Sequence, residues 1–304
     1  MRTPSYWRPW FGICTVLLLA GCGAGAAPPA VPLTSTAAAM QPATKAQNLL
    51  YISDLGANDV AVYTYPKGTL LQKLTGFGSV AGLCSNRGGD VFVVDEAGPL
   101  DVYAHGGSTP FRQLTTSGAP YGCSVDPTTG DLALTQLSAY EYGAMAVYPK
   151  ANGKPRFYVD KTIDATWFCG YDGSGNLFAD AWDRYGNVIL VELPKGGKTF
   201  RKYKLGKSFN QAGGVQWDGR YIAVGNFGDG VIYRTNESGH VMQTVTLKGG
   251  SNVEQFWIAG STLIGPAAQS PGVAPFWHYP GGGSAYNTIS GLTWPFGATL
   301  STAR

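Results

Sequence analysis

The chain has 304 residues, of which 43 are glycine and 19 proline, while 12% are aromatic and only 13% are charged. This composition argues against a mainly helical protein, which would need more Glu and Lys, and favours many short strands joined by tight turns. The formal net charge is +3 with no basic stripe or patch, so the sequence gives no reason to expect nucleic-acid binding.

The first 21 residues have the features of an export signal. Arg2 and Arg8 precede an apolar run over residues 11–19, which is shorter than the roughly 20 residues that a membrane-spanning helix needs. A Leu-Ala-Gly-Cys sequence ending at Cys22 follows where cleavage is expected. It resembles the lipobox of bacterial lipoproteins, which implies cleavage before Cys22 and lipidation of its thiol. An ordinary signal peptide with an incidental cysteine is the alternative.

The resemblance to lipoproteins also implies a location. The lipid would anchor the exported chain to the membrane of the cell envelope. Gly23 stands where a retention signal for the inner membrane usually has Asp, so in a Gram-negative host we expect the outer membrane. Residues 22–47 are mostly Ala, Pro, Ser and Thr and are expected to form a flexible tether.

A repeat dominates residues 48–304. Each copy combines a short strand carrying Cys or an apolar residue, a tight turn with Asp and Gly, and further alternating strands. The clearest copies are Gly122–Asp126, Phe168–Asp172 and Gly214–Asp218, and the anchor positions fall at 84, 123, 169, 215, 256 and 297. Spacings of 39 to 46 residues with four short strands per repeat are typical of propeller blades.

The two ends of the repeat region predict how the ring closes. Residues 49–54, 60–65 and 70–75 supply three strands with no inner strand before them, and the chain ends with one inner strand after Pro295. Pairing that strand with residues 49–54 completes a sixth blade and removes an open edge. We therefore expect an all-β, six-bladed β-propeller. The pattern of Gly, an apolar residue, Asp and Gly resembles NHL repeats, and the whole is similar to TolB-like and gluconolactonase-like propellers, folds that host many activities.

The expected blades have two faces. Loops that lead into each inner strand, and loops between the second and third strands, lie on what we call the loop face; the remaining turns lie on the turn face. Ligands of similar propellers usually bind at the loop face. It gathers carboxylates and aromatic side chains, and our candidate ligand residues there are Asp54, Asp95, Tyr121, Glu141, Asp164, Trp167, Asp180, Trp182, Asn226, Glu254 and Trp294.

Aromatic rings beside carboxylates suit sugars, cations and peptides. The alternative for each single residue is structural, with Asp holding turns and aromatic rings packing between blades. We favour a non-catalytic binding or scaffold module for a glycan, peptide or protein partner, acting as a monomer. The rivals are a structural module held by its rim and a metal-dependent enzyme of the lactonase or lyase type. A calcium or magnesium site is an alternative for which the sequence offers no motif, so we assign no metal ligands and no catalytic residues.

The cysteines and histidines add little chemistry. His105, His240 and His278 are expected in or beside turns of the turn face, where they build neither a catalytic triad nor a zinc site. Cys84, Cys123 and Cys169 occupy the same register of three successive inner strands. Inner strands of neighbouring blades are expected about 8–10 Å apart, farther than a disulfide spans. We therefore interpret these cysteines as small buried apolar residues.

Overall fold

The computed structural model describes residues 47–137 and 143–303, and these residues fold almost entirely as β-strands. In this part of the chain, one turn of 3-10 helix, η1 (Pro149–Ala151), interrupts the strands, and no helix there is long and apolar enough to cross a membrane. The expected signal peptide, the lipidation site Cys22, most of the tether and Glu141 lie outside the described residues.

Four sheets contain four strands each. The first, in spatial order, consists of β24 (Pro295–Ser301), β1 (Leu49–Asp54), β2 (Asp59–Thr64) and β3 (Leu70–Leu74). The second consists of β4 (Val80–Ser85), β5 (Val91–Asp95), β6 (Leu100–Tyr103) and β7 (Arg112–Leu114). The third consists of β8 (Pro120–Val125), β9 (Leu132–Gln136), β10 (Ala144–Tyr148) and β11 (Arg156–Val159). The fourth consists of β12 (Ile163–Tyr171), β13 (Leu177–Asp183), β14 (Val188–Leu193) and β15 (Arg201–Tyr203).

The fifth sheet has eight strands and is built from two antiparallel sets. One set is β16 (Gln211–Trp217), β17 (Ile222–Phe227), β18 (Val231–Thr235) and β19 (Val241–Lys248). The other is β20 (Trp257–Ala259), β21 (Thr262–Ile264), β22 (Gly272–His278) and β23 (Gly282–Leu292). Only a short parallel contact between β19 and β23 joins them, through the pairs Leu247–Gly283 and Lys248–Ser284.

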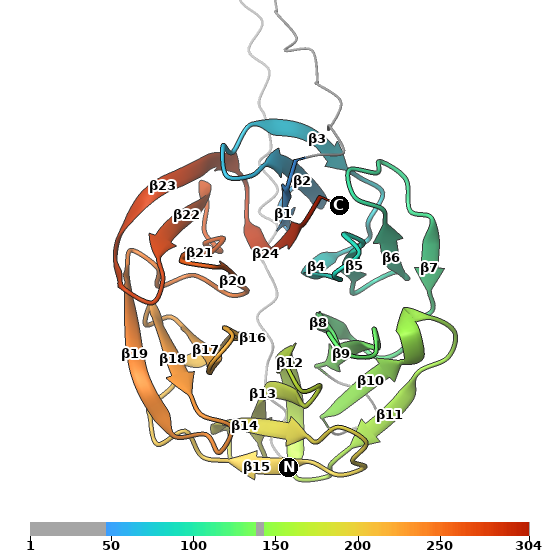
Figure 1. Ribbon diagram of the computed structural model, residues 1–304, viewed down its shortest axis with the longest axis vertical. Helices are drawn as coiled ribbons and strands as arrows, with labels where there is room; N and C mark the ends of the chain where they lie inside the picture. Colours follow the sequence, from blue (N-terminus) through green and yellow to red (C-terminus); the bar gives the residue numbers. More distant parts are fainter. Residues whose placement is uncertain (1–46, 138–142, 304) are drawn as a thin grey trace, which may run out of the picture. The chain divides into compact units, whose positions relative to one another are not determined.

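The sheets are arranged around a common centre, with β24, β4, β8, β12, β16 and β20 innermost (Figure 1). We call these six the inner strands. Five of the six anchor positions found in the sequence lie within them, and Phe256 directly precedes β20. The all-β prediction and the order of strands in each repeat are therefore confirmed.

The last strand pairs with the first. In the antiparallel pair of β24 and β1, Ala298 lies opposite Ile52 and Gly297 lies opposite Ser53. The Ser53 hydroxyl accepts a hydrogen bond from the Gly297 N–H at 3.0 Å. This pairing confirms the expected junction of the two ends of the repeat region.

The repeated Asp and Gly residues form the turns that follow the inner strands. Asp172 accepts hydrogen bonds through Oδ1 from the N–H groups of Ser174 and Asn176, at 2.8 and 2.9 Å. Gly175 in the same turn has a φ of +90°, a conformation that favours glycine. Asx turns of this kind explain why Asp and Gly recur at a fixed offset from each inner strand.

The alternating strand pattern divides the core between neighbouring sheets. Tyr51 of β1 packs with Val80 and Leu83 of the second sheet. Its chain neighbour Ile52 packs on the opposite side with Ile264 and Phe276. Because both sides of β1 are covered, all six of its residues are buried, and the strand is apolar along most of its length.

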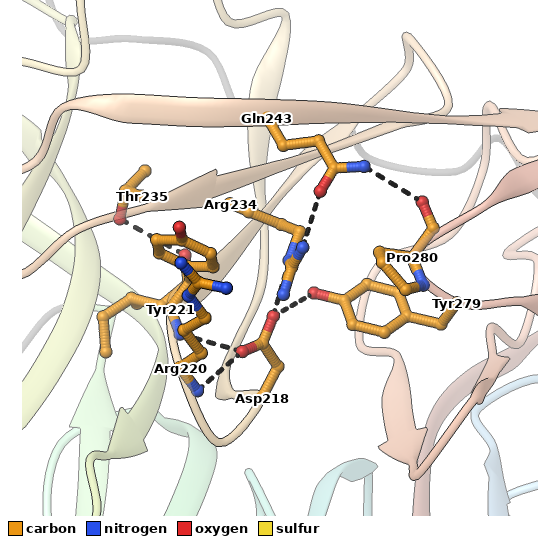
Figure 2. Close-up of polar contacts among 9 residues, drawn as sticks. Asp218, Arg220, Tyr221, Arg234, Thr235, Gln243, Tyr279 and Pro280 are labelled. Atoms are coloured by element: carbon orange, nitrogen blue, oxygen red, sulfur yellow. Dashed lines mark hydrogen bonds and ion pairs between the residues drawn. The ribbon is translucent and has the colours of Figure 1, made fainter.

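A polar network ties together the two sets of the eight-stranded sheet (Figure 2). Asp218, in the turn after β16, accepts hydrogen bonds through Oδ2 from Arg234 Nε at 2.7 Å and from the Tyr279 hydroxyl at 2.6 Å. Arg234 also donates to Gln243, whose amide donates to the Pro280 carbonyl. Burial alone would raise the pKa of Asp218, but these donors outweigh it and lower the pKa. The network therefore holds an ionised carboxylate between the two sets.

Candidate functional site

Aromatic side chains from several inner strands meet at the loop face. The rings of Tyr121, Phe168 and Phe296 lie 5.0 to 5.9 Å apart between centroids. Trp167 packs edge-on against Tyr121 at 5.2 Å and also contacts Trp182 at 5.0 Å. Tyr121 and Phe296 lie at the starts of β8 and β24, and Phe168 lies near the middle of β12, so the cluster sits toward the loop-face end of the inner strands.

Three carboxyl groups surround the Tyr121 ring. The Tyr121 hydroxyl donates to Oε2 of Glu254 at 3.3 Å. Burial raises the pKa of Glu254 to about 7, and the charge of Glu96 adds to the shift. Burial and the charge of Asp95 raise the pKa of Glu96 in the same direction. Within residues 47–137 and 143–303, neither glutamate makes an ion pair.

Asp180 is the third carboxyl group near Tyr121 and is fully buried on β13. Its Oδ1 accepts a hydrogen bond from the Phe168 N–H at 2.7 Å, whereas its Oδ2 has no partner at hydrogen-bonding geometry. Burial raises the pKa of Asp180 well above its usual value, although the N–H groups of Phe168 and Gly213 oppose the shift. The Nε1 of Trp167 is likewise buried without a partner.

The other described candidate residues hold loops, bond to neighbouring residues or are exposed. Asp54 accepts hydrogen bonds from the N–H groups of Thr293 and Trp294, and Asp95 accepts them from Gly78 and Ser79. These two aspartates hold loops. Among the rest, Asn226 is hydrogen-bonded to Asn210, Ser208 and Asp229, while Asp164 and Trp294 are exposed. Of the candidates, the structure therefore brings together Tyr121, Trp167, Asp180, Trp182 and Glu254, and the sequence analysis did not select Glu96.

The cavity at this cluster is small. It has a volume of about 20 Å³ and is lined by Tyr121, Trp167, Phe168, Gln211, Ala212, Phe227 and Glu254. This is room for about one water molecule. In the described part of the chain, no group of three or more His, Cys, Asp or Glu residues is arranged to hold a metal ion. The cluster is therefore a surface with a shallow central recess.

A glutamine crosses the centre beneath the cluster. The Gln255 amide donates to the Leu83 carbonyl at 2.7 Å and accepts from the Leu83 N–H at 2.9 Å. A Cβ at Gly297 would lie 2.2 Å from Gln255 Oε1, so only glycine leaves room for this bridge. Sequence analysis missed it because the two partners are 172 residues apart and nothing in the repeat pattern marks the glutamine.

The prediction that the inner-strand cysteines are unpaired is wrong for two of them. Cys84 and Cys123 form a disulfide with a Cα–Cα distance of 5.6 Å, while Cys169 is a buried free thiol. The inner strands approach more closely than expected because Gly82 has no side chain. A Cβ there would lie 2.6 Å from the Tyr121 carbonyl oxygen. Glycines in the inner strands were the signal that could have predicted this approach.

The comparisons with known proteins support the fold class and do not identify a function. No family model and no curated protein matches the chain. A crystal structure of a protein of unknown function from Bacteroides caccae is similar, with a TM-score of 0.65 and 9% sequence identity. The match covers 84% of this chain and 99% of that one. At this level of identity, the similarity shows a shared all-β, propeller-like fold alone.

Proposed function

We propose that residues 48–304 form a six-bladed β-propeller that is exported, anchored by a lipid at Cys22, and acts as a binding module at its loop face. Two features support the six blades: the eight-stranded sheet divides into two antiparallel sets of four, and only two residue pairs join them. The lipid anchor rests on the resemblance of residues 19–22 to a lipobox.

The ligand that best fits the loop face is a basic side chain of a peptide or protein partner. The observation that carries this proposal is the position of Glu96 and Glu254 near Tyr121, whose hydroxyl donates to Glu254. Burial raises the pKa of all three groups, and the charges of the two glutamates add to the shift of Tyr121. Neither has a cation to balance it among the described residues. An arriving ammonium or guanidinium group would supply that charge and contact the Tyr121 and Trp167 rings.

The size of the recess favours a partner that inserts one group. A volume of about 20 Å³ does not hold a whole small molecule, since ligand pockets usually measure roughly 300–1,000 Å³. A side chain that projects from a larger partner needs only a contact surface, which the surrounding aromatic rings provide. Trp294 at 42% exposure offers further aromatic area on this face.

The test compares two blocked tripeptides, one with a central arginine and one with the neutral isostere citrulline, by isothermal titration calorimetry. We expect binding of the arginine peptide alone, and tighter binding at pH 8 than at pH 6, because ionised Glu254 becomes more abundant above its pKa of about 7. Glu254→Gln should weaken binding about tenfold. The exposed Glu237, in the turn between β18 and β19, provides a matched control, Glu237→Gln.

Equal binding of the two peptides, or full binding by Glu254→Gln, would show that the loop face does not recognise a basic group. The rival enzyme is tested separately, by thermal unfolding with calcium or EDTA and by hydrolysis of a lactone. Stabilisation by calcium together with lactone turnover would favour the metal-dependent enzyme instead.

A further inference from the structure

A second hollow lies at the centre of the turn face. It has a volume of about 560 Å³ and continues inward into a cavity of about 200 Å³ between the inner strands. Four residues line both and make them continuous: Ser85, Val125, Pro127 and Trp257. We call this continuous space the turn-face pocket, and its volume falls in the range of sites that hold small molecules.

The turn-face pocket is separated from the loop face. Gln255 lines its inner part and is fixed to Leu83 by two hydrogen bonds. Beyond it, the rings of Tyr121, Phe168 and Phe296 pack against one another. A molecule in the turn-face pocket therefore does not reach Glu254, and an inference about this pocket stands independently of the function proposed for the loop face.

Aromatic side chains form part of the pocket wall. Trp217 and Trp257 are half-buried, and Tyr171 is buried beside them in the inner cavity. Neither of the two indole N–H groups donates a hydrogen bond within the described residues. Neither belongs to the buried unpaired atoms found there, so both can reach a ligand. The wall thus combines flat apolar ring faces with free donors, the pairing of properties by which Trp binds partly polar molecules.

The charged groups at the mouth are one cation and two carboxylates, Arg87, Asp90 and Asp126. Arg87 is exposed and makes no ion pair in the described part of the chain. Two carboxylates line the same mouth: Asp90, which accepts from the Asn86 amide, and Asp126. Burial would raise the pKa of Asp126, but hydrogen bonds from Thr128 and Thr129 lower it. The carboxylates disfavour an anionic ligand and can accept further hydrogen bonds, while Arg87 and the two indoles provide the donors.

We infer that the turn-face pocket binds a neutral, hydroxyl-rich saccharide of one or two rings. Such a ligand presents apolar ring faces to Trp217 and Trp257 and oxygen acceptors to Arg87 and the indole N–H groups. Its hydroxyls donate to oxygen atoms at the mouth, where Asp90 and Asp126 retain free lone pairs. No part of the ligand needs a charge.

The experiment measures binding of maltose, cellobiose, lactose and N,N′-diacetylchitobiose by isothermal titration calorimetry, with intrinsic tryptophan fluorescence as a second signal. We expect saturable binding of at least one of the four. Trp257→Leu removes the ring and should weaken binding about tenfold or more, whereas Trp257→Phe keeps an aromatic face and should weaken it about threefold. Arg87→Ala should reduce affinity about threefold without affecting folding, since the side chain is exposed.

Trp294→Ala, on the loop face, is the control and should leave saccharide affinity unchanged. Thermal unfolding of each variant checks that the fold is retained, and Arg87→Ala keeps the test informative if Trp257→Leu fails to fold. The inference is overturned if none of the four sugars binds at concentrations up to about 20 mM. It is also overturned if binding persists in both Trp257→Leu and Arg87→Ala, or disappears in Trp294→Ala.

Discussion

Two sets of buried or half-buried carboxyl groups, one near Tyr121 on the loop face and one in the turns of the turn face, have pKa values that are shifted in opposite directions. On the loop face, burial raises the pKa of Glu96, Asp180 and Glu254. On the turn face, the pKa values of Asp126 and Asp218 are lowered although both side chains are also buried. The difference lies in the number of hydrogen-bond donors that reach each carboxyl group.

On the turn face, N–H and hydroxyl groups of the turns provide these donors. Asp126 receives hydrogen bonds from the N–H and hydroxyl of Thr128 and from the hydroxyl of Thr129, whereas Glu254 receives one, from Tyr121. A carboxylate with several donors stays ionised when it is buried, and one with few donors is held toward the neutral form. Asp126 and Asp218 therefore serve the structure of the turns, whereas Glu96 and Glu254 remain available to a ligand. The predictions below test this division, from the largest expected effect to the smallest.

The disulfide between the second and third sheets should give the largest effect. Replacing Cys84 and Cys123 together with alanine frees a loop of 39 residues, for which chain entropy predicts a loss of about 4 kcal/mol in the free energy of unfolding. Urea denaturation measures it. Cys169→Ala is the control and should lose about 1 kcal/mol. A double variant as stable as the control would mean that the inner strands are held together without the disulfide.

Asp218→Asn should give the next largest loss in the free energy of unfolding. It leaves Arg234, whose side chain is only 12% exposed, without its carboxylate, and we expect a loss of about 3 kcal/mol by urea denaturation at pH 7. The more exposed pair of Lys202 and Asp160 supplies the comparison, because Asp160→Asn should lose less than about 1 kcal/mol. Similar losses in the two variants would contradict the structural role assigned to the turn-face carboxylate.

Gln255→Ala should destabilise the protein by about 2 kcal/mol, because the buried N–H and C=O of Leu83 both lose a partner. Hydrogen exchange at the Leu83 amide should accelerate in parallel. Gln216 bonds to Ile258 in the same way, at 3.0 and 2.7 Å, but is only part-buried. Water can replace its bonds, so Gln216→Ala should lose about half as much. The reverse order would mean that Gln255 does not seal the centre.

The last comparison pairs two substitutions, each of which replaces a carboxyl group with a neutral amide. We expect them to change the free energy of unfolding in opposite directions. The pKa of Glu254 is about 7 in the folded protein and lower in the unfolded chain. The free energy of unfolding therefore falls as pH rises from the unfolded pKa to the folded pKa. Glu254→Gln should therefore stabilise the protein by about 1 kcal/mol at pH 8. Asp126 has a lowered pKa, so its contribution is present above the unfolded pKa and is lost as pH falls through the folded pKa. Asp126→Asn weakens the hydrogen bonds from Thr128 and Thr129 and should destabilise the protein by about 1 kcal/mol at pH 8. Effects of the same sign would contradict the division between the faces.

The sequence predicted the strands well because their information is local. The Asp and Gly of each turn and the alternation along each strand recur in every repeat, as in Asp172 and Gly175. Closure was also predictable, since the first three strands lacked an inner partner and the last inner strand lacked a sheet.

The features that the sequence did not predict depend on distances between sheets. The disulfide was rejected because the inner strands were assigned a uniform spacing, which Gly82 reduces. The Gln255 bridge joins residues far apart in the chain. The turn-face pocket depends on space that side chains leave unfilled, which no sequence pattern records. Among the loop-face candidates, only the structure could separate Glu254, which retains an open carboxylate, from Asp54 and Asp95, which hold loops.

The pairing of β24 with β1 places the two ends of the folded chain together. Leu49 lies opposite Ser301, and the Ala303 N–H donates to the Asn48 side chain at 2.9 Å. A short linker between these ends would make the polypeptide continuous, and a cut in any exposed turn would then create new termini. The fold should tolerate such circular permutation. The N-terminus could then lie in any of the sheets. With the proposed lipid anchor placed on the new N-terminus, such a permutant would present either face to the membrane.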